Sequence, residues 1–126
     1  NIDDHPRNHA AIAKEGDWKL SPAYDLTPAT PISEERRELA MACGDFGRWA
    51  NAENMLSQSE RFFLKKDDAK AIIAEMEKVV RSEWYKTMRA QRVSEHDAEL
   101  LRSAFVYPGF SLPADVAARL AEAADE

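Results

Sequence analysis

The sequence predicts a mainly α protein with a short β-hairpin near its N-terminus. Residues 48–126 are rich in Ala, Leu, Glu, Lys and Arg and repeat their apolar residues at helical spacings of three and four. Residues 1–47 carry most of the proline and all but one of the glycine, and include a turn-like cluster between two short apolar runs. We therefore expect one domain over residues 1–126, with a loop and hairpin half (1–47) and a helical bundle (48–126).

The hairpin is expected where the turn-like residues 14–17 separate the runs 8–13 and 18–20. This arrangement places Asn8 at the start of one strand and Asp25 just past the end of the other, so both polar residues meet at one end of the hairpin. Prolines keep the following stretch extended. Residues 32–47 remain ambiguous, because 33–36 resemble a helix start whereas 39–42 suit a short strand that ends at Gly44.

The helical half begins with a moderate helix over residues 51–63 and continues with a longer one of roughly six turns over about 67–91. Acidic Asp67 and Asp68 suit the N-terminal end of the long helix, and Arg89 and Arg92 suit its C-terminal end. Glu77 and Arg81 are spaced for an i,i+4 ion pair. The apolar stripe of this helix is Ile72, Ile73, Met76, Val79, Val80, Trp84 and Met88.

The remaining helices are marked by their ends. Ser94 with Asp97 resembles a capping box before an apolar pattern that continues to Phe105. Pro108 and Gly109 end that helix, and Pro113 suits the first turn of a last one.

Packing roles follow from the same patterns. We expect the apolar stripe of the long helix and the Phe62–Phe63 pair to lie in the core, with the charged face of the helix in solvent. Trp18 and Tyr24 are interpreted as packing residues rather than ligands.

Composition narrows the class of protein. The formal net charge is −6 with basic residues scattered among acidic ones, which argues against a dominant nucleic-acid surface. No apolar run approaches the roughly 18 residues of a membrane span, no signal peptide is visible, and the single Cys43 excludes an internal disulfide. These features predict a cytoplasmic protein.

The N-terminal residues carry the strongest chemical pattern. Asp3, His5 and Asn8 form the pattern D-x-H-x-x-N, and Asp25 follows on a short extended segment. Phosphoryl transfer from ATP needs such a set, because one carboxylate orients the acceptor hydroxyl while an amide oxygen and a second carboxylate hold magnesium. The five-residue offset from Asp3 to Asn8 equals the Asp-to-Asn spacing of the protein-kinase catalytic loop.

Each residue also has a structural interpretation. Asp3 could belong to a polar terminus, and Asn8 and Asp25 could be turn residues. His5 is predicted to order the loop by hydrogen bonding, whereas a zinc site with His9 is opposed by the intervening proline and the lack of further ligands.

Arg7, inside the same pattern, could contact a phosphate or an acidic group of a substrate, or could face solvent.

Together with the segment Leu20-Ser21-Pro22-Ala23-Tyr24-Asp25, the D-x-H-x-x-N pattern resembles the C-terminal region of HipA-type serine/threonine kinases, the toxin halves of bacterial toxin–antitoxin pairs. Residues 39–41 resemble the next segment of that family, so the motif-level resemblance covers about residues 1–45.

The resemblance implies roles for the site residues. Asp3 corresponds to the catalytic aspartate, with His5 beside it in the catalytic loop, and Asn8 and Asp25 fall on magnesium-ligand positions. The cofactors implied are Mg²⁺ and ATP.

The resemblance also implies partners. They are a protein substrate with a Ser or Thr acceptor, a HipB-like DNA-binding antitoxin, and an N-terminal lobe with the phosphate-binding loop and ATP lysine that this chain does not contain. A start inside the catalytic loop indicates part of an enzyme, expected to be inactive alone. Two other hypotheses stay open: a non-catalytic helical interaction module, and a lipid or small-molecule kinase, since phosphatidylinositol kinases share D-x-H-x-x-N.

Overall fold

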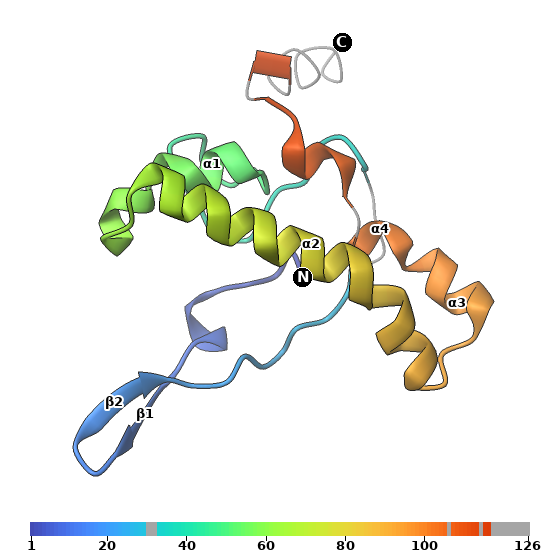
Figure 1. Cartoon of the computed structure of the whole chain (residues 1–126), viewed down its shortest axis with the longest axis horizontal. Helices are drawn as coiled ribbons and strands as arrows, with labels where there is room; N and C mark the ends of the chain where they lie inside the picture. The colour runs from blue at the N-terminus through green and yellow to red at the C-terminus, as the bar shows by residue number, and fades with distance from the viewer. Residues whose placement is uncertain (30–32, 106, 114, 117–126) are drawn as a thin grey trace.

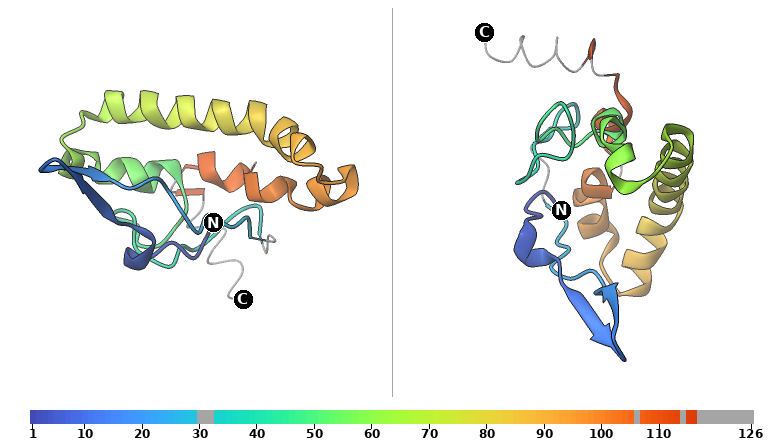
Figure 2. Two further views of the ribbon diagram at one scale, coloured as in Figure 1. Left: turned by 90° about the horizontal axis from the view of Figure 1, so that it is seen from below. Right: turned by 90° about the vertical axis from the view of Figure 1, so that its left-hand side faces the viewer.

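The long helix α2 (Lys66–Ala90) spans the molecule, and the shorter helices lie along one side of it (Figures 1 and 2). The computed structural model describes residues 1–29, 33–105, 107–113 and 115–116. Helices α1 (Ala52–Ser57), α3 (Glu95–Leu100) and α4 (Arg102–Phe105) all contact α2. The predicted mainly α fold with an N-terminal hairpin is confirmed.

The ends of α2 and α3 follow the signals in the sequence. Acidic residues occupy the first turn of α2 and Arg89 its last turn, which complements the helix dipole. The predicted ion pair forms, with Arg81 Nη2 at 2.7 Å from Glu77 Oε1. Ser94 caps α3, because its Oγ accepts a 3.0 Å hydrogen bond from the backbone N–H of Asp97. Among the described residues, no helix is long and apolar enough to cross a membrane.

Two predicted helices are shorter than expected because each is interrupted by a residue with non-helical backbone angles. The helix predicted over 51–63 stops at Gln58 (φ −115°, ψ 16°) and continues as a 3₁₀ turn, η2 (Ser59–Phe62). The helix after Ser94 breaks at Leu101 (φ −97°, ψ 0°), which separates α3 from α4.

The chain then leaves the helical pattern where prolines predicted it. A 3₁₀ turn, η3 (Pro108–Ser111), follows α4, as expected from Pro108 and Gly109. The helix predicted after Pro113 falls mainly on residues 114 and 117–126, outside the described residues.

The predicted hairpin is confirmed, with β1 (Ala11–Lys14) antiparallel to β2 (Asp17–Leu20). Lys14 pairs with Asp17, so the loop is the dipeptide Glu15-Gly16, and both residues have positive φ (54° and 85°). Positive φ at both positions is typical of a type I′ turn, whose twist matches that of paired strands.

The hairpin projects away from the helices (Figure 1). All eight strand residues are exposed, and Trp18 is 70% exposed. The prediction that Trp18 packs in the protein is therefore wrong, because no described element covers this side of the hairpin.

Residues 33–49 form neither the helix nor the regular strand that the sequence left open. They fold back on themselves through two isolated antiparallel bridges, Glu38 with Trp49 and Gly44 with Gly47. Backbone bonds Leu39 N–H to Arg48 O (2.7 Å) and Ala40 N–H to Ile2 O (2.9 Å) tie this segment to itself and to the N-terminus.

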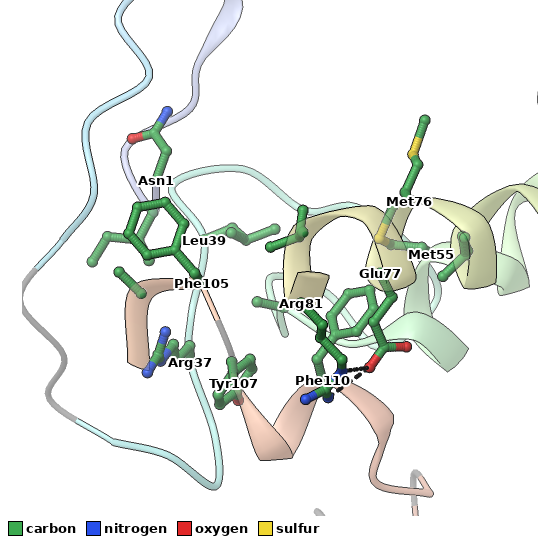
Figure 3. A pocket seen from close by; sticks show the side chains of 15 residues that line it. Asn1, Arg37, Leu39, Met55, Met76, Glu77, Arg81, Phe105, Tyr107 and Phe110 are labelled. Carbon is green, nitrogen blue, oxygen red and sulfur yellow. Dashed lines mark hydrogen bonds and ion pairs between the residues drawn. The ribbon is translucent and has the colours of Figure 1, made fainter. Parts of the chain in front are cut away.

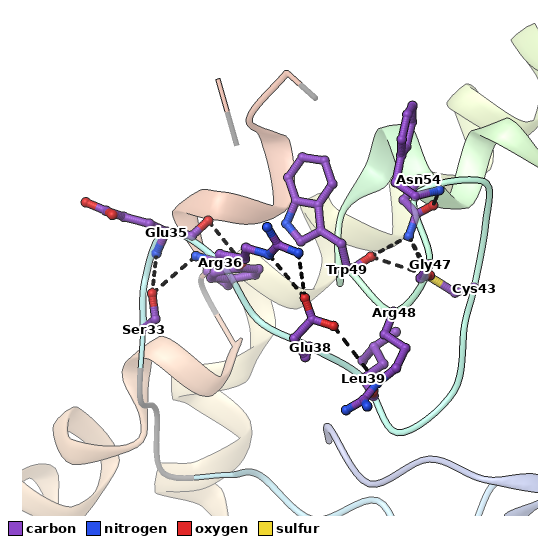
Figure 4. A network of polar contacts seen from close by, with 12 residues as sticks. Ser33, Glu35, Arg36, Glu38, Leu39, Cys43, Gly47, Arg48, Trp49 and Asn54 are labelled. Carbon is purple, nitrogen blue, oxygen red and sulfur yellow. Dashed lines mark hydrogen bonds and ion pairs between the residues drawn. The ribbon is translucent and has the colours of Figure 1, made fainter. Parts of the chain in front are cut away.

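Asn54 of α1 holds the folded-back segment in place (Figure 4). Its side chain is fully buried, and its Nδ2 donates to the carbonyl oxygens of Trp49 (2.8 Å) and Gly47 (3.0 Å). Its Oδ1 accepts from the backbone N–H of Phe46 at 2.8 Å. A buried amide with every group paired specifies one loop conformation.

A second asparagine joins distant parts of the chain. Asn51 is fully buried and caps α1, since its Oδ1 accepts from Glu53 N–H at 2.8 Å. Its Nδ2 donates to Gly109 O (2.9 Å) and Leu112 O (2.8 Å), which fixes η3 against the start of α1. The core is thus small and partly polar; its buried hydrophobic residues, among those described, are Trp49, Ala69, Ala98 and Tyr107.

Several apolar residues predicted to lie in the core are exposed. Phe62 is 71% and Phe63 is 99% exposed, and Phe63 adopts a left-handed conformation (φ 58°) where η2 ends. On the stripe of α2, Met76 is 63% exposed, and Ile72, Val79 and Val80 are also exposed. These predictions are wrong because the elements that contact α2, which are α1, α3, α4 and η2, cover only part of its apolar surface.

Candidate functional site

The D-x-H-x-x-N segment closes into a short turn. Pro6 opens a 3₁₀ turn, η1 (Pro6–Asn8), where its fixed φ suits the first position and its missing N–H is not needed. The backbone N–H of His5 donates to Asn8 Oδ1 at 3.1 Å, and Asn8 N–H donates to His5 O at 2.9 Å. The first bond fixes the side chain of Asn8 relative to the loop, and the second closes the backbone turn.

The structure joins Asn8 to Asp25. Asn8 is 7% exposed, and its Nδ2 donates a 2.8 Å hydrogen bond to Asp25 Oδ2, 17 residues further along the chain. The hairpin makes this contact possible, because its pairing continues beyond the strands with Ser21 N–H bonded to Ala10 O at 2.8 Å. The expected meeting at one end of the hairpin is confirmed, although Asn8 lies in η1 and not at the start of β1.

The pair can offer oxygen ligands to a magnesium ion. Asn8 must point Nδ2 towards Asp25 and Oδ1 towards the His5 N–H, which settles the orientation of its amide. Asp25 is exposed and keeps Oδ1 and further lone pairs for a cation, and Asn8 Oδ1 keeps one lone pair. Carboxylate and amide oxygens are ligands that Mg²⁺ prefers, and Mg²⁺ retains several waters, so two protein ligands fit such a site.

The two carboxylates before the turn are arranged differently. Asp3 is exposed, and within the described part of the chain no hydrogen bond links its carboxylate to Asn8 or Asp25. Asp4 Oδ2 and His9 Nε2 lie within hydrogen-bonding distance, 2.9 Å apart. In the described ranges, no three His, Cys, Asp or Glu residues gather in one place.

His5 orders the loop through its backbone. Its imidazole Nδ1 is buried with no hydrogen-bond partner among the described residues, whereas its N–H holds Asn8. The prediction of loop ordering by hydrogen bonding is thus met by the main chain and not by Nδ1.

The residues that precede Asn8 and Asp25 in the sequence, Arg7 and Tyr24, are also in contact. Arg7 is exposed, and its carbonyl oxygen accepts a 2.6 Å hydrogen bond from the hydroxyl of Tyr24. Tyr24 is 44% exposed, and its hydroxyl makes a polar contact that the predicted packing role did not include. The position of Tyr24 directly before Asp25 was the signal in the sequence that could have identified it.

A separate cavity lies between α2, α4 and the N-terminal segment (Figure 3). Its volume is about 270 Å³, and its walls are mostly apolar, with the Glu77–Arg81 ion pair among its polar lining. None of Asp3, His5, Asn8 and Asp25 lines it. Its apolar lining includes Leu39, Met55, Met76, Phe105 and Phe110.

Comparison with known families identifies the domain. The family model for the HipA-like C-terminal domain matches residues 1–84. The chain belongs to this HipA-like family. The match includes the N-terminal turn, the hairpin, Asp25 and most of α2, so every candidate site residue of this HipA-like domain lies inside it. Searches of the curated proteins and of the solved structures found no match.

Proposed function

We propose that this HipA-like domain is part of an ATP-dependent serine/threonine protein kinase of the toxin type, which transfers the γ-phosphoryl group of Mg-ATP to a Ser or Thr hydroxyl. The observation that carries the proposal is the 2.8 Å contact of Asn8 with Asp25. Two polar residues whose spacing and sequence context resemble kinase magnesium ligands meet in space because a turn and a hairpin bring them together.

The residues have distinct roles in this proposal. Asp25 and Asn8 present oxygen atoms to Mg²⁺, which when bound neutralises charge on the phosphates. Asp3, exposed at the start of the same loop, orients the acceptor hydroxyl. The exposed Arg7 is placed to contact a phosphate or an acidic group of the substrate. His5 supports the reaction by holding Asn8 through its N–H.

The proposal requires further parts that come from the family resemblance. An N-terminal lobe would supply the phosphate-binding loop and the lysine that contacts ATP. A HipB-like antitoxin would restrain the kinase in the cytoplasm. We expect residues 1–126 without such a lobe to show no turnover, and robust phosphorylation by these residues alone would contradict that expectation.

The test is transfer of the γ-phosphate of Mg-ATP by a protein that contains this chain and an N-terminal lobe. Asp3→Ala and Asp25→Ala should each reduce turnover roughly 100-fold or more. The melting curve should stay unchanged in Asp3→Ala, whereas Asp25→Ala should melt at a lower temperature, because it leaves the buried Nδ2 of Asn8 without its partner. Asp17→Ala is the matched control, because Asp17 is an exposed aspartate in β2, paired with Lys19 at 3.3 Å. Full turnover in the Asp25 variant would refute the kinase proposal.

The acceptor needs its own experiment. Offering protein, lipid and small-molecule acceptors to the same enzyme distinguishes a protein kinase from a lipid or small-molecule kinase of the same ancestry. Phosphate found in a lipid alone would refute the proposed substrate class.

A second candidate function is a non-catalytic interaction module. The exposed Phe62 and Phe63 and the partly uncovered stripe of α2 favour it, because large exposed apolar side chains often mark binding surfaces. If this function is correct, Asp25→Ala leaves partner binding unchanged, whereas Phe62→Ser with Phe63→Ser abolishes it.

A further inference from the structure

We propose that Tyr24 is a positioning residue, whose hydroxyl holds Asp25 in the orientation that presents its carboxylate to magnesium. This inference rests on the proposed kinase function. It concerns a residue that the D-x-H-x-x-N pattern does not contain, and it follows from two adjacent contacts.

Two hydrogen bonds join the consecutive residues Tyr24 and Asp25 to the consecutive residues Arg7 and Asn8. Tyr24 donates to Arg7 O at 2.6 Å, and the next residue, Asp25, accepts from the next residue of the loop, Asn8, at 2.8 Å. A single hydrogen bond would allow the segment carrying Asp25 to pivot about it. Two bonds from consecutive residues fix both its position and its rotation relative to the loop.

The backbone of Asp25 makes this restraint necessary. Its φ is 57°, in the left-handed region that most L-residues avoid, although aspartate tolerates it better than most. Asp25 is exposed and begins no helix or strand, so burial and secondary structure do not hold it there. Besides the bond of Asp25 to Asn8, the hydrogen bond of the Tyr24 hydroxyl restrains the chain one residue earlier.

Ordinary core packing does not account for Tyr24. Tyr24 is 44% exposed, and Trp18, six residues earlier, and Leu26, two residues later, are 70% and 64% exposed. What the structure does give Tyr24 is one short hydrogen bond to the main chain of the magnesium-binding loop. Removing the hydroxyl while keeping the ring therefore tests the proposed role directly.

The expected effect is on magnesium and not on the fold. In Tyr24→Phe, Asp25 would spend part of its time in other orientations, so the concentration of Mg²⁺ for half-maximal rate should rise roughly two- to tenfold, the loss expected for one neutral hydrogen bond. The rate at saturating Mg²⁺ should change much less, since bound metal restores the orientation.

Tyr107→Phe is the matched control. It deletes the same hydroxyl, which donates to the backbone carbonyl of Glu35 at 3.1 Å, in a part of the molecule that holds none of the proposed ligands. The assays are turnover against Mg²⁺ concentration in the kinase that contains this chain, and direct Mn²⁺ binding in the presence of ADP, followed by electron paramagnetic resonance.

Three results decide the matter. Weaker binding of Mn²⁺ and a higher Mg²⁺ requirement in Tyr24→Phe, with neither change in Tyr107→Phe, support the proposal. Unchanged metal binding in Tyr24→Phe, or equal losses in both variants, overturns it. Asp25→Ala is measured alongside, because full turnover in that variant rejects the kinase function itself, independently of Tyr24.

Discussion

Replacing Asn8 with aspartate turns its attractive contact with Asp25 into a repulsive one. In the native protein Asn8 Nδ2 donates to Asp25 Oδ2 at 2.8 Å. In Asn8→Asp two carboxylate oxygens face each other across that distance. We expect the variant to be destabilised in the absence of divalent cations and to regain stability when Mg²⁺ is added.

The magnitude follows from the geometry. Two unit charges 2.8 Å apart repel by ~1.5 kcal/mol at the dielectric constant of water, a lower bound because Asn8 is buried. Losing a hydrogen bond to a charged group adds ~1.5 kcal/mol or more. The free energy of unfolding should fall by about 3 kcal/mol, and a cation held by both carboxylates should reverse most of the loss.

Urea unfolding of residues 1–126, with EDTA and with millimolar Mg²⁺, measures both effects. Asn1→Asp is the control, since it adds the same charge to an exposed residue of the same segment. If Asn8→Asp and the native protein have equal free energies of unfolding in EDTA, Asn8 and Asp25 are not in contact. A loss that Mg²⁺ does not reduce would refute the inference that the pair forms a cation site.

Three further predictions concern stability and reactivity. Asn54→Ala leaves buried backbone groups unpaired and should lower the free energy of unfolding by about 3 kcal/mol in chemical denaturation, and a loss below about 1 kcal/mol would show that water replaces the amide. Gly109→Ala should destabilise the protein more than Gly16→Ala, because a Cβ on Gly109 would collide with the backbone of Glu35. A Cβ on Gly16 meets open space, so only the positive φ of that residue opposes the substitution. Thermal melting compares the two variants, and equal melting temperatures would contradict the collision. Burial raises the pKa of the Cys43 thiol, so the folded protein should react with a disulfide reagent at pH 8 more slowly than the same cysteine does in urea. The stability that comes from this raised pKa should be present at neutral pH and lost as the pH rises through the pKa of the folded state. Equal reaction rates in the folded and unfolded chain would contradict the raised pKa.

Local signals in the sequence were sufficient for some of the regular elements. The i,i+3 and i,i+4 repeat and the charges at both ends predicted α2, and Ser94 predicted the start of α3, because these effects act within a few residues. The turn-like residues 14–17 predicted the hairpin for the same reason. Once the hairpin was expected, the meeting of Asn8 with Asp25 followed from its geometry.

Periodicity could not show which apolar residues are covered. The stripe of α2 and the Phe62–Phe63 pair have the pattern of core residues, yet burial depends on which other elements reach them. The buried asparagines were missed for a related reason. Asn51 and Asn54 stabilise the fold by bonding to carbonyl oxygens of segments that lie elsewhere in the sequence or fold back irregularly.

The sequence by itself determined the mainly α class, the hairpin, the ends of α2 and the start of α3, because local propensity encodes them. Motif spacing in the sequence also nominated the residues of the candidate site. The tertiary structure alone decided how that site is held. The orientation of the Asn8 amide and the role of Tyr24 depend on hydrogen bonds between residues 17 apart, and such contacts exist only after the chain has folded.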